Sequence, residues 1–222
     1  MPVTAVLAAG VGVRRGWRGT LRSASFRLES PLTGQSALGV LTVGHGAATA
    51  VVDLLAGLIS PSYGELRVLG EDMRTEHGRM AVRARTGVAR RGGPARPGIR
   101  VRGLVEHAAR RTRLPRRDRN LLAAAILDRL FLTPWADVPV QSAPQLVARR
   151  ARLAAAAVHQ PELLLIDGLL DGLPPPEAAA LAASVRDIGL DTGVIVVGRD
   201  ADSLAQACGD VLTLADGILV GC

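Results

Sequence analysis

The sequence predicts an α/β fold, and three stretches support that prediction. Residues 38–58 contain an apolar strand, a glycine turn and a helix of Ala, Val and Leu. Residues 159–177 contain a buried strand that ends in Asp167, after which a loop and a helix follow. Residues 193–200 contain a third apolar run. Strands that alternate with helices indicate an α/β domain.

The composition is consistent with one such domain. The chain has 222 residues, 48% of them hydrophobic, which allows a sizeable core and argues against disorder. Cys208 and Cys222 provide neither a disulfide framework nor a metal-binding spacing. No uncharged apolar run reaches the ~18 residues of a membrane span, and arginines follow the mildly apolar residues 3–13 rather than precede them, which is the wrong polarity for a signal peptide. We therefore expect a cytoplasmic protein.

Arginine dominates the charge of the chain. There is no lysine, so all 27 basic residues are arginine, and thirteen of them lie within residues 83–119, where Glu106 and Asp118 are the acids. Such a region attracts phosphates, acidic lipid headgroups or an acidic protein partner. A solvated face and a docking surface both explain it.

The N-terminal part of the chain predicts short strands. Residues 3–7 and 25–30 are expected to be strands, with a turn over residues 14–19 between them. Residues 65–69 alternate as a further strand, and residues 72–84 are polar with weak helical character.

The middle of the chain predicts a strand and then helices. Residues 86–91 are expected to be a strand, and residues 92–98 a linker because they are rich in Gly and Pro. Amphipathic helices are expected over residues 102–109 and 121–130, around a break at residues 115–119.

The C-terminal part completes the fold. A second linker over residues 133–145 leads into a helix, and residues 201–207 are expected to be helical. The last residues, 210–220, predict a hairpin, because Asp216 and Gly217 between apolar strands indicate a type I′ turn.

Four of these stretches, in order and at the right spacing, resemble the ATP-binding cassette of ABC transporters. Leu54-Leu-Ala-Gly-Leu58 and Ser60-Pro-Ser-Tyr-Gly-Glu-Leu-Arg-Val68 resemble the family's LLAGL-x-x-P-x-x-G-x-(I/V), and residues 159–177 resemble its x-x-P-x-L-L-L-L-D-E-P-T-x-G-L-D-P. The resemblance covers about residues 15–220 and implies an α/β, P-loop NTPase-like cassette with a mostly parallel core sheet and an N-terminal β layer. It also implies that the phosphate site lies at the carboxyl ends of the parallel strands. It assigns residues 1–90 and 159–222 to the nucleotide-binding core, and residues 91–158 to a helical subdomain with an arginine-rich surface.

The phosphate-binding loop departs from the family's pattern. The family's G-x-x-G-x-G-K-[ST]-T becomes Thr42-Val-Gly-His-Gly-Ala-Ala-Thr-Ala50, with alanine in place of the lysine. The resemblance implies that Trp17 stacks on adenine, although a loop tryptophan lying on arginine side chains explains it equally well. The remaining cofactor-binding candidates are Gly44, His45, Gly46, Ala47, Ala48, Thr49 and Ala50.

No catalytic position of the family is intact. Gly168 stands at the glutamate that polarises water, Arg199 at the histidine switch and Arg91 at the Q-loop glutamine. Thr49 and Asp167 keep the positions that bind magnesium, although an aspartate at a strand end also caps loops without any metal. Arg91 or Arg199 could still reach a phosphate, because guanidinium pairs well with phosphate oxygens.

The signature motif that contacts ATP on the opposing subunit is equally altered. It fits either Ser142-Ala-Pro-Gln145 or Ala143-Pro-Gln-Leu-Val147. Neither has the family's glycines, and Pro144 has no N–H to donate.

The sequence thus predicts a degenerate ABC-type ATP-binding subunit of a membrane transporter, a pseudo-ATPase that acts as a regulatory or structural half. The implied cofactors are ATP and magnesium. The implied partners are a second cassette subunit, in a homodimer or heterodimer, and a membrane permease at the inner face of the cell membrane. The alternative is a cassette-fold protein without a transporter, which binds nucleic acid or another polyanion through its arginine-rich region. A working ATPase would need a lysine or a glutamate that the sequence lacks.

Overall fold

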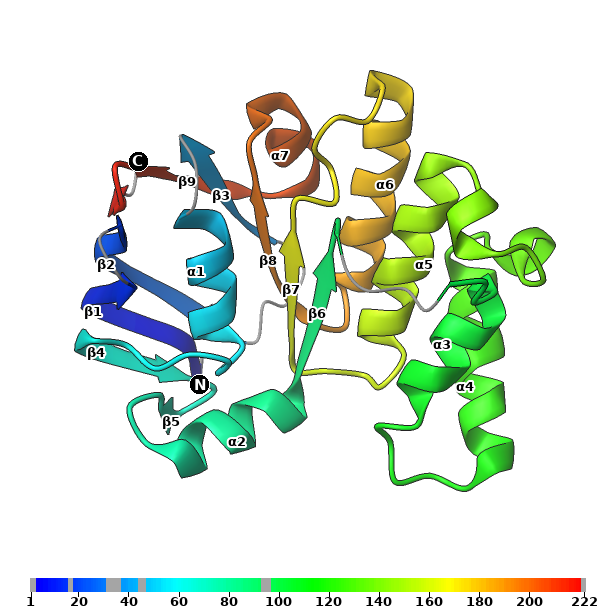
Figure 1. Ribbon diagram of the computed structural model, residues 1–222, viewed down its shortest axis with the longest axis horizontal. Coiled ribbons are helices and arrows are strands. Elements are labelled where there is room, and N and C mark those ends of the chain that lie inside the picture. The colour runs from blue at the N-terminus through cyan, green and yellow to red at the C-terminus, as the bar shows by residue number, and fades with distance from the viewer. Residues whose placement is uncertain (1–2, 16–17, 31–36, 44–46, 93–96, 221–222) are drawn as a thin grey trace.

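In the computed structural model, the apolar run that ends in Asp167 is strand β7 (Leu163–Asp167), inside a ten-stranded sheet (Figure 1). The structure describes residues 3–15, 18–30, 37–43, 47–92 and 97–220.

Five strands form the parallel core of this sheet. Their order is β9-β3-β8-β7-β6, and each pair of neighbours runs parallel. Parallel strands covered on both faces must be apolar throughout, and the four residues 163–166 of β7 are fully buried. The other core strands are β3 (Leu38–Val43), β6 (Thr86–Arg90), β8 (Gly193–Gly198) and β9 (Asp210–Ala215).

Mostly antiparallel strands continue the sheet as the N-terminal β layer, which the C-terminal strand β10 joins in parallel to β2. β1 pairs with β2 and β4, β4 with β5, and β10 joins β2 to β9. Helix α1 (Ala47–Leu55) lies between this layer and the parallel strands, as Figure 1 shows, and its Val51 and Leu54 belong to the same buried cluster as Val6 and Leu165. The layer comprises β1 (Val3–Arg15), β2 (Arg18–Ser30), β4 (Tyr63–Val68), β5 (Glu71–Asp72) and β10 (Ile218–Val220).

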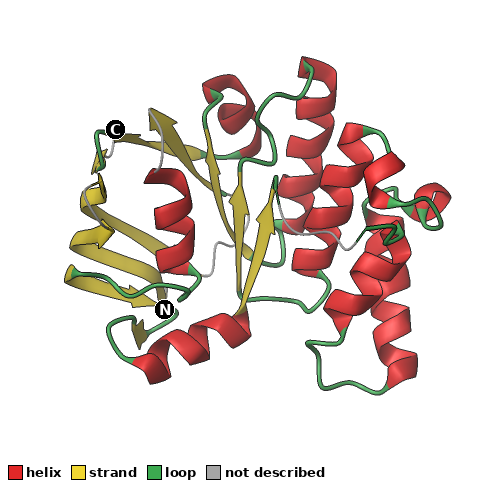
Figure 2. Ribbon diagram, in the orientation of Figure 1, coloured by secondary structure: helices red, strands yellow, loops and turns green. Residues whose placement is uncertain are grey.

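Most helices cover the other face of the parallel strands (Figure 2). Leu164 and Ile166 of β7 belong to the buried cluster that α3 to α7 share. Helix α5 contacts β6 and β7 as well as α3 and α6. The assignment of residues 91–158 to a separate helical subdomain stays a prediction. These helices are α3 (Val101–Ala109), α4 (Arg116–Arg129), α5 (Gln145–Ala157), α6 (Pro175–Ile188) and α7 (Ala201–Ala207), while α2 (Glu76–Arg85) connects β5 to β6.

Three local expectations are corrected. Residues 14, 15, 18 and 19 of the predicted turn are strand instead, because β1 extends to Arg15 and β2 begins at Arg18. The predicted break at residues 115–119 is largely helix, because Pro115 precedes α4, where a missing N–H is tolerated. The linker over residues 133–145 contains two short 3₁₀ turns, Thr133–Trp135 and Val140–Ser142.

The hairpin at the end of the chain is confirmed. Asp216 and Gly217 both have positive φ, at 50° and 76°, as a type I′ turn requires. In the described part of the chain, no helix has the length and apolar character needed to cross a membrane.

The buried strand β7 should dominate stability. Leu165 is fully buried, so Leu165→Ala is expected to lower the free energy of unfolding by about 2–5 kcal/mol. Leu121 on α4 is 61% exposed, and Leu121→Ala should change it by less than about 0.5 kcal/mol. Denaturant unfolding compares the two variants, and equal effects would contradict the buried position of β7.

A second prediction concerns pH. Burial raises the pKa of the Cys208 thiol to about 12, from an ordinary value of 9.0. Because the folded pKa is the higher one, the stabilising contribution of the protonated thiol is complete below pH 9.0 and is lost as the pH rises towards 12. In a Cys222→Ser background, a thiol reagent at pH 8 should modify Cys208 only after unfolding, and rapid native labelling would contradict its burial.

Candidate functional site

A cavity of about 370 Å³ lies where the carboxyl ends of the parallel strands meet. Thr42 contributes from the end of β3, and Thr49 from the first turns of α1. Ala48 on α1 also lines the cavity. The other lining residues lie at or just after the carboxyl ends of β6, β7 and β8, and they are Arg90, Arg91, Gly92, Asp167, Gly168, Asp171, Val197, Gly198 and Arg199. The carboxyl edge is where an α/β sheet places its ligand site.

The cavity gathers most of the described site candidates. Six of them line it: Ala48, Thr49, Arg91, Asp167, Gly168 and Arg199. Ala50 is instead buried on α1, and Ala47 begins that helix. Trp17, Gly44, His45 and Gly46 lie outside the described residues. The individual roles assigned to these residues stay predictions.

Sequence reasoning missed Arg90, the last residue of β6. Its guanidinium forms an ion pair with Asp53 on α1, and its Nε lies 3.8 Å from Oδ2 of Asp167. The register of the parallel strands pairs Arg90 with Asp167, so the expected strands, once aligned at their ends, would have pointed to this neighbour. Asp53 follows Thr49 by one helical turn and therefore shares its face of α1.

Asp167 lies in an unusual electrostatic environment. Burial raises the pKa of its carboxyl group, and the nearby Asp53 and Asp171 raise it further, while Arg90 opposes them. Arg90 is thus the charge that favours the ionised form of Asp167.

Asp171 anchors the residue at the histidine-switch position. Its carboxylate, in a residue only 7% exposed, accepts a hydrogen bond from the backbone N–H of Arg199 at 2.9 Å and another from Nε of Arg199 at 3.4 Å. The Arg199 side chain nevertheless remains 57% exposed. The Arg199 guanidinium can therefore contact a ligand while it remains hydrogen-bonded to Asp171.

A buried arginine on α5 holds the loop that follows β7. Nη1 of Arg149 donates to the carbonyl oxygens of Leu169 and Asp171, the latter at 2.9 Å, and more weakly to that of Gly168 at 3.3 Å. Burial lowers the pKa of Arg149, and the neighbouring Arg91 lowers it further.

Both registers of the signature motif lie where α5 begins, with Pro144 at its N-cap. The role of that motif stays a prediction.

The loop conformation suits glycine at the glutamate position. Gly168 has φ of +65°, and a Cβ added there would lie 3.3 Å from Oδ2 of Asp171. A glutamate would therefore combine left-handed strain with a neighbouring carboxylate.

The implied cofactors fit this cavity unequally. A phosphate suits it, because α1 begins beside it and Arg90, Arg91 and Arg199 line it. Magnesium fits poorly, although Thr49 and Asp167 lie in one cavity, because Arg90 already sits beside the carboxylate that would bind the ion. Within the described ranges, no group of three or more His, Cys, Asp and Glu residues is arranged to hold a metal.

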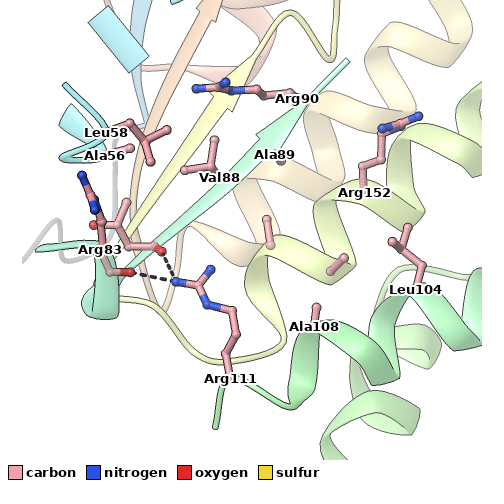
Figure 3. A pocket seen from close by; sticks show the side chains of 13 residues that line it. Ala56, Leu58, Arg83, Val88, Ala89, Arg90, Leu104, Ala108, Arg111 and Arg152 are labelled. Atoms are coloured by element: carbon pink, nitrogen blue, oxygen red, sulfur yellow. Dashed lines mark hydrogen bonds between the residues drawn. The ribbon is translucent and has the colours of Figure 1, made fainter. Parts of the chain in front are cut away.

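A second cavity, of about 530 Å³, lies against the edge strand β6 (Figure 3). Its lining is apolar except for Thr86 and four arginines, Arg83, Arg90, Arg111 and Arg152, with no acidic side chain among the described residues that form it. Arg111 donates to the carbonyl oxygens of Arg83 and Thr86, at 2.7 and 3.4 Å. Arg90 is among the lining residues of both cavities.

Comparison with known proteins identifies the fold. No family model matches the chain, but curated proteins do. It is 25% identical over 186 residues to the methionine import ATP-binding protein MetN 2 of Burkholderia mallei, covering 82% of this chain and 47% of the relative. It is 30% identical over 172 residues to the daunorubicin resistance ATP-binding protein DrrA3 of Streptomyces coeruleorubidus, covering 76% and 54%. The chain thus spans about half the length of these curated relatives.

Solved structures agree at the level of architecture. CbiO1 of Clostridium perfringens, part of the ABC transporter complex cbiONQ, superposes with a TM-score of 0.82 at 17% identity, over 98% of this chain and 87% of that one. A metal-chelate type ABC transporter in an inward-facing conformation gives 0.80 at 17% identity, over 99% and 82%. The chain therefore has the α/β fold of an ABC cassette, with a mixed sheet whose core is parallel.

The conformation of Gly168 gives a stability prediction. Gly168→Ala should lower the free energy of unfolding by about 1–2 kcal/mol, because alanine is strained at positive φ. Gly168→Glu should cost more, and adding Asp171→Asn should recover part of the loss. Gly103→Ala is the matched control and should raise stability by about 0.5–1 kcal/mol, since Gly103 is inside α3 and an added Cβ would meet Ile99 Cγ1 at an ordinary contact distance of 3.6 Å. Denaturant unfolding measures all four variants, and a neutral Gly168→Ala would contradict the loop geometry.

Proposed function

We propose that this chain is the ATP-binding subunit of an ABC transporter and that it works as a weak or inactive ATPase, a regulatory or structural half of the assembly. One observation carries the proposal: the cavity at the strand ends keeps Thr49 and Asp167, but it has Gly168 where the catalytic glutamate stands in the family. The cassette fold and the similarity to ATP-binding proteins of import and resistance systems support the transporter role.

Magnitudes support weak catalysis. A general acid or base contributes about 10²–10⁴ in rate, and Gly168 cannot supply one. A charge-assisted hydrogen bond contributes about 1.5–3 kcal/mol, and Ala48 cannot form the one that the P-loop lysine makes in the family. The positive φ of Gly168 argues that Gly168→Glu would not simply restore catalysis, because a glutamate would be strained in this loop.

The proposed partners are a second cassette subunit and a membrane permease, at the inner face of the cell membrane. The cavity against β6 suits a permease segment, because its apolar floor and its arginines match an amphipathic helix that carries carboxylates. A defective half would then contribute shape and docking, while the partner cassette supplies the missing groups.

The polyanion alternative has less support. Some arginines of residues 83–119 already have an acidic neighbour: Arg85 pairs with Glu162, while the exposed Arg100 and Arg102 approach Asp137 on the surface. Salt-sensitive binding of RNA or DNA at physiological ionic strength would favour the alternative.

ATP binding and turnover test the proposal. We expect the purified chain to hydrolyse ATP at least about 10²-fold more slowly than a cassette with intact lysine and glutamate, and to co-purify with its permease and partner cassette. Thr49→Ala should weaken whatever ATP binding the wild type shows, without changing assembly. Steady turnover by the chain alone, with micromolar affinity, would contradict the pseudo-ATPase role, and failure to join any permease would contradict the transporter role.

A further inference from the structure

We infer that Arg90 is a built-in cation that takes the place of magnesium, so that the cavity at the strand ends binds a nucleotide or another phosphate ester without a metal ion. This inference rests on the proposed nucleotide site and adds that nucleotide binding there requires no magnesium ion.

The position of Arg90 is the first step. Its side chain reaches from the end of β6 across the end of β7 to α1, where it pairs with Asp53. Its Nε lies 3.8 Å from Oδ2 of Asp167 and has no hydrogen-bond acceptor within the described part of the chain. One guanidinium thus bridges the two elements that would hold a metal ion between them.

The charges around Asp167 are the second step. Asp53 and Asp167 are only 13% and 18% exposed at their side chains, and the Arg90 side chain is 30% exposed. Two poorly hydrated carboxylates near each other require a cation, and Arg90 supplies it from within the chain. A divalent ion at Asp167 would have to displace this guanidinium or accept a like charge beside it.

The phosphate itself has other cations to meet. Arg91 and Arg199 line the same cavity, and among the described residues no ion pair joins the Arg91 side chain to a carboxylate. Its guanidinium lies over Gly172, where an added Cβ would be 3.7 Å from Nη1. Arg90 is balanced by Asp53 and Asp167, and Arg199 pairs with Asp171. Arg91 is therefore the cation of the cavity lining that is left to meet a phosphate.

Calorimetric titration with ATP, in EDTA and in excess magnesium, tests the inference on the full chain. We expect the two dissociation constants of the wild type to agree within about twofold. In the double variant Asp53→Asn with Arg90→Leu, which removes one charge of each sign, affinity in EDTA should fall about tenfold or more, and magnesium should restore it.

Arg129→Leu is the matched control. Arg129 also bridges two aspartates, Asp187 at 2.6 Å and Asp191 at 2.8 Å, but it lies outside the cavity. This variant should keep the wild-type insensitivity to magnesium, which separates the role of Arg90 from the general effect of losing an arginine bridge.

The wild-type titration decides the outcome even if the double variant does not fold. A tenfold or larger gain in wild-type affinity on adding magnesium, or no ATP binding in either condition, would overturn the inference. Metal-independent ATP binding by a chain that joins no permease would contradict the transporter role and leave the inference standing.

Discussion

The burial of β7 on both faces is the constraint on which the rest of the structure depends. Its alternate side chains enter two different cores, one shared with α1 and the N-terminal layer and the other shared with α3 to α7. The strand can therefore carry no polar side chain until it leaves the core, and it does so at Asp167. The first carboxylate of the strand thus lies at the sheet edge, beside the ends of β6 and β8.

Much of the fold was predictable because these constraints are local and periodic. The uniformly apolar sequences of the core strands and the Asp216-Gly217 pair each predict their local structure directly. Elements that depend on single contacts were predicted less sharply, and residues 72–84 showed only weak helical character. Helix α2 begins at a cap where Thr75 Oγ1 accepts a hydrogen bond from Gly78 N–H at 3.0 Å, and the polar composition of that segment conceals this.

The candidate site divides in the same way. The motif resemblance located six of the residues that line the cavity, but it could not indicate the arrangement of charges among them. Arg90 sits at a position where no family motif draws attention, and its role depends on the register of β6 against β7 and on the reach of a long side chain to Asp53. The left-handed conformation of Gly168 likewise depends on where the loop turns, which residue type alone does not state.

The buried Arg149 has a mechanical consequence. One side chain on α5 grips the carbonyl oxygens of three residues in the loop after β7, Gly168, Leu169 and Asp171. Helix α5 cannot move away from the sheet without breaking these hydrogen bonds. The buried guanidinium of Arg149 would then lack hydrogen-bond acceptors, which costs free energy. The helical part and the strand ends consequently move as one piece. In the proposed assembly of two cassettes, this chain would act as a rigid unit against which the partner cassette moves.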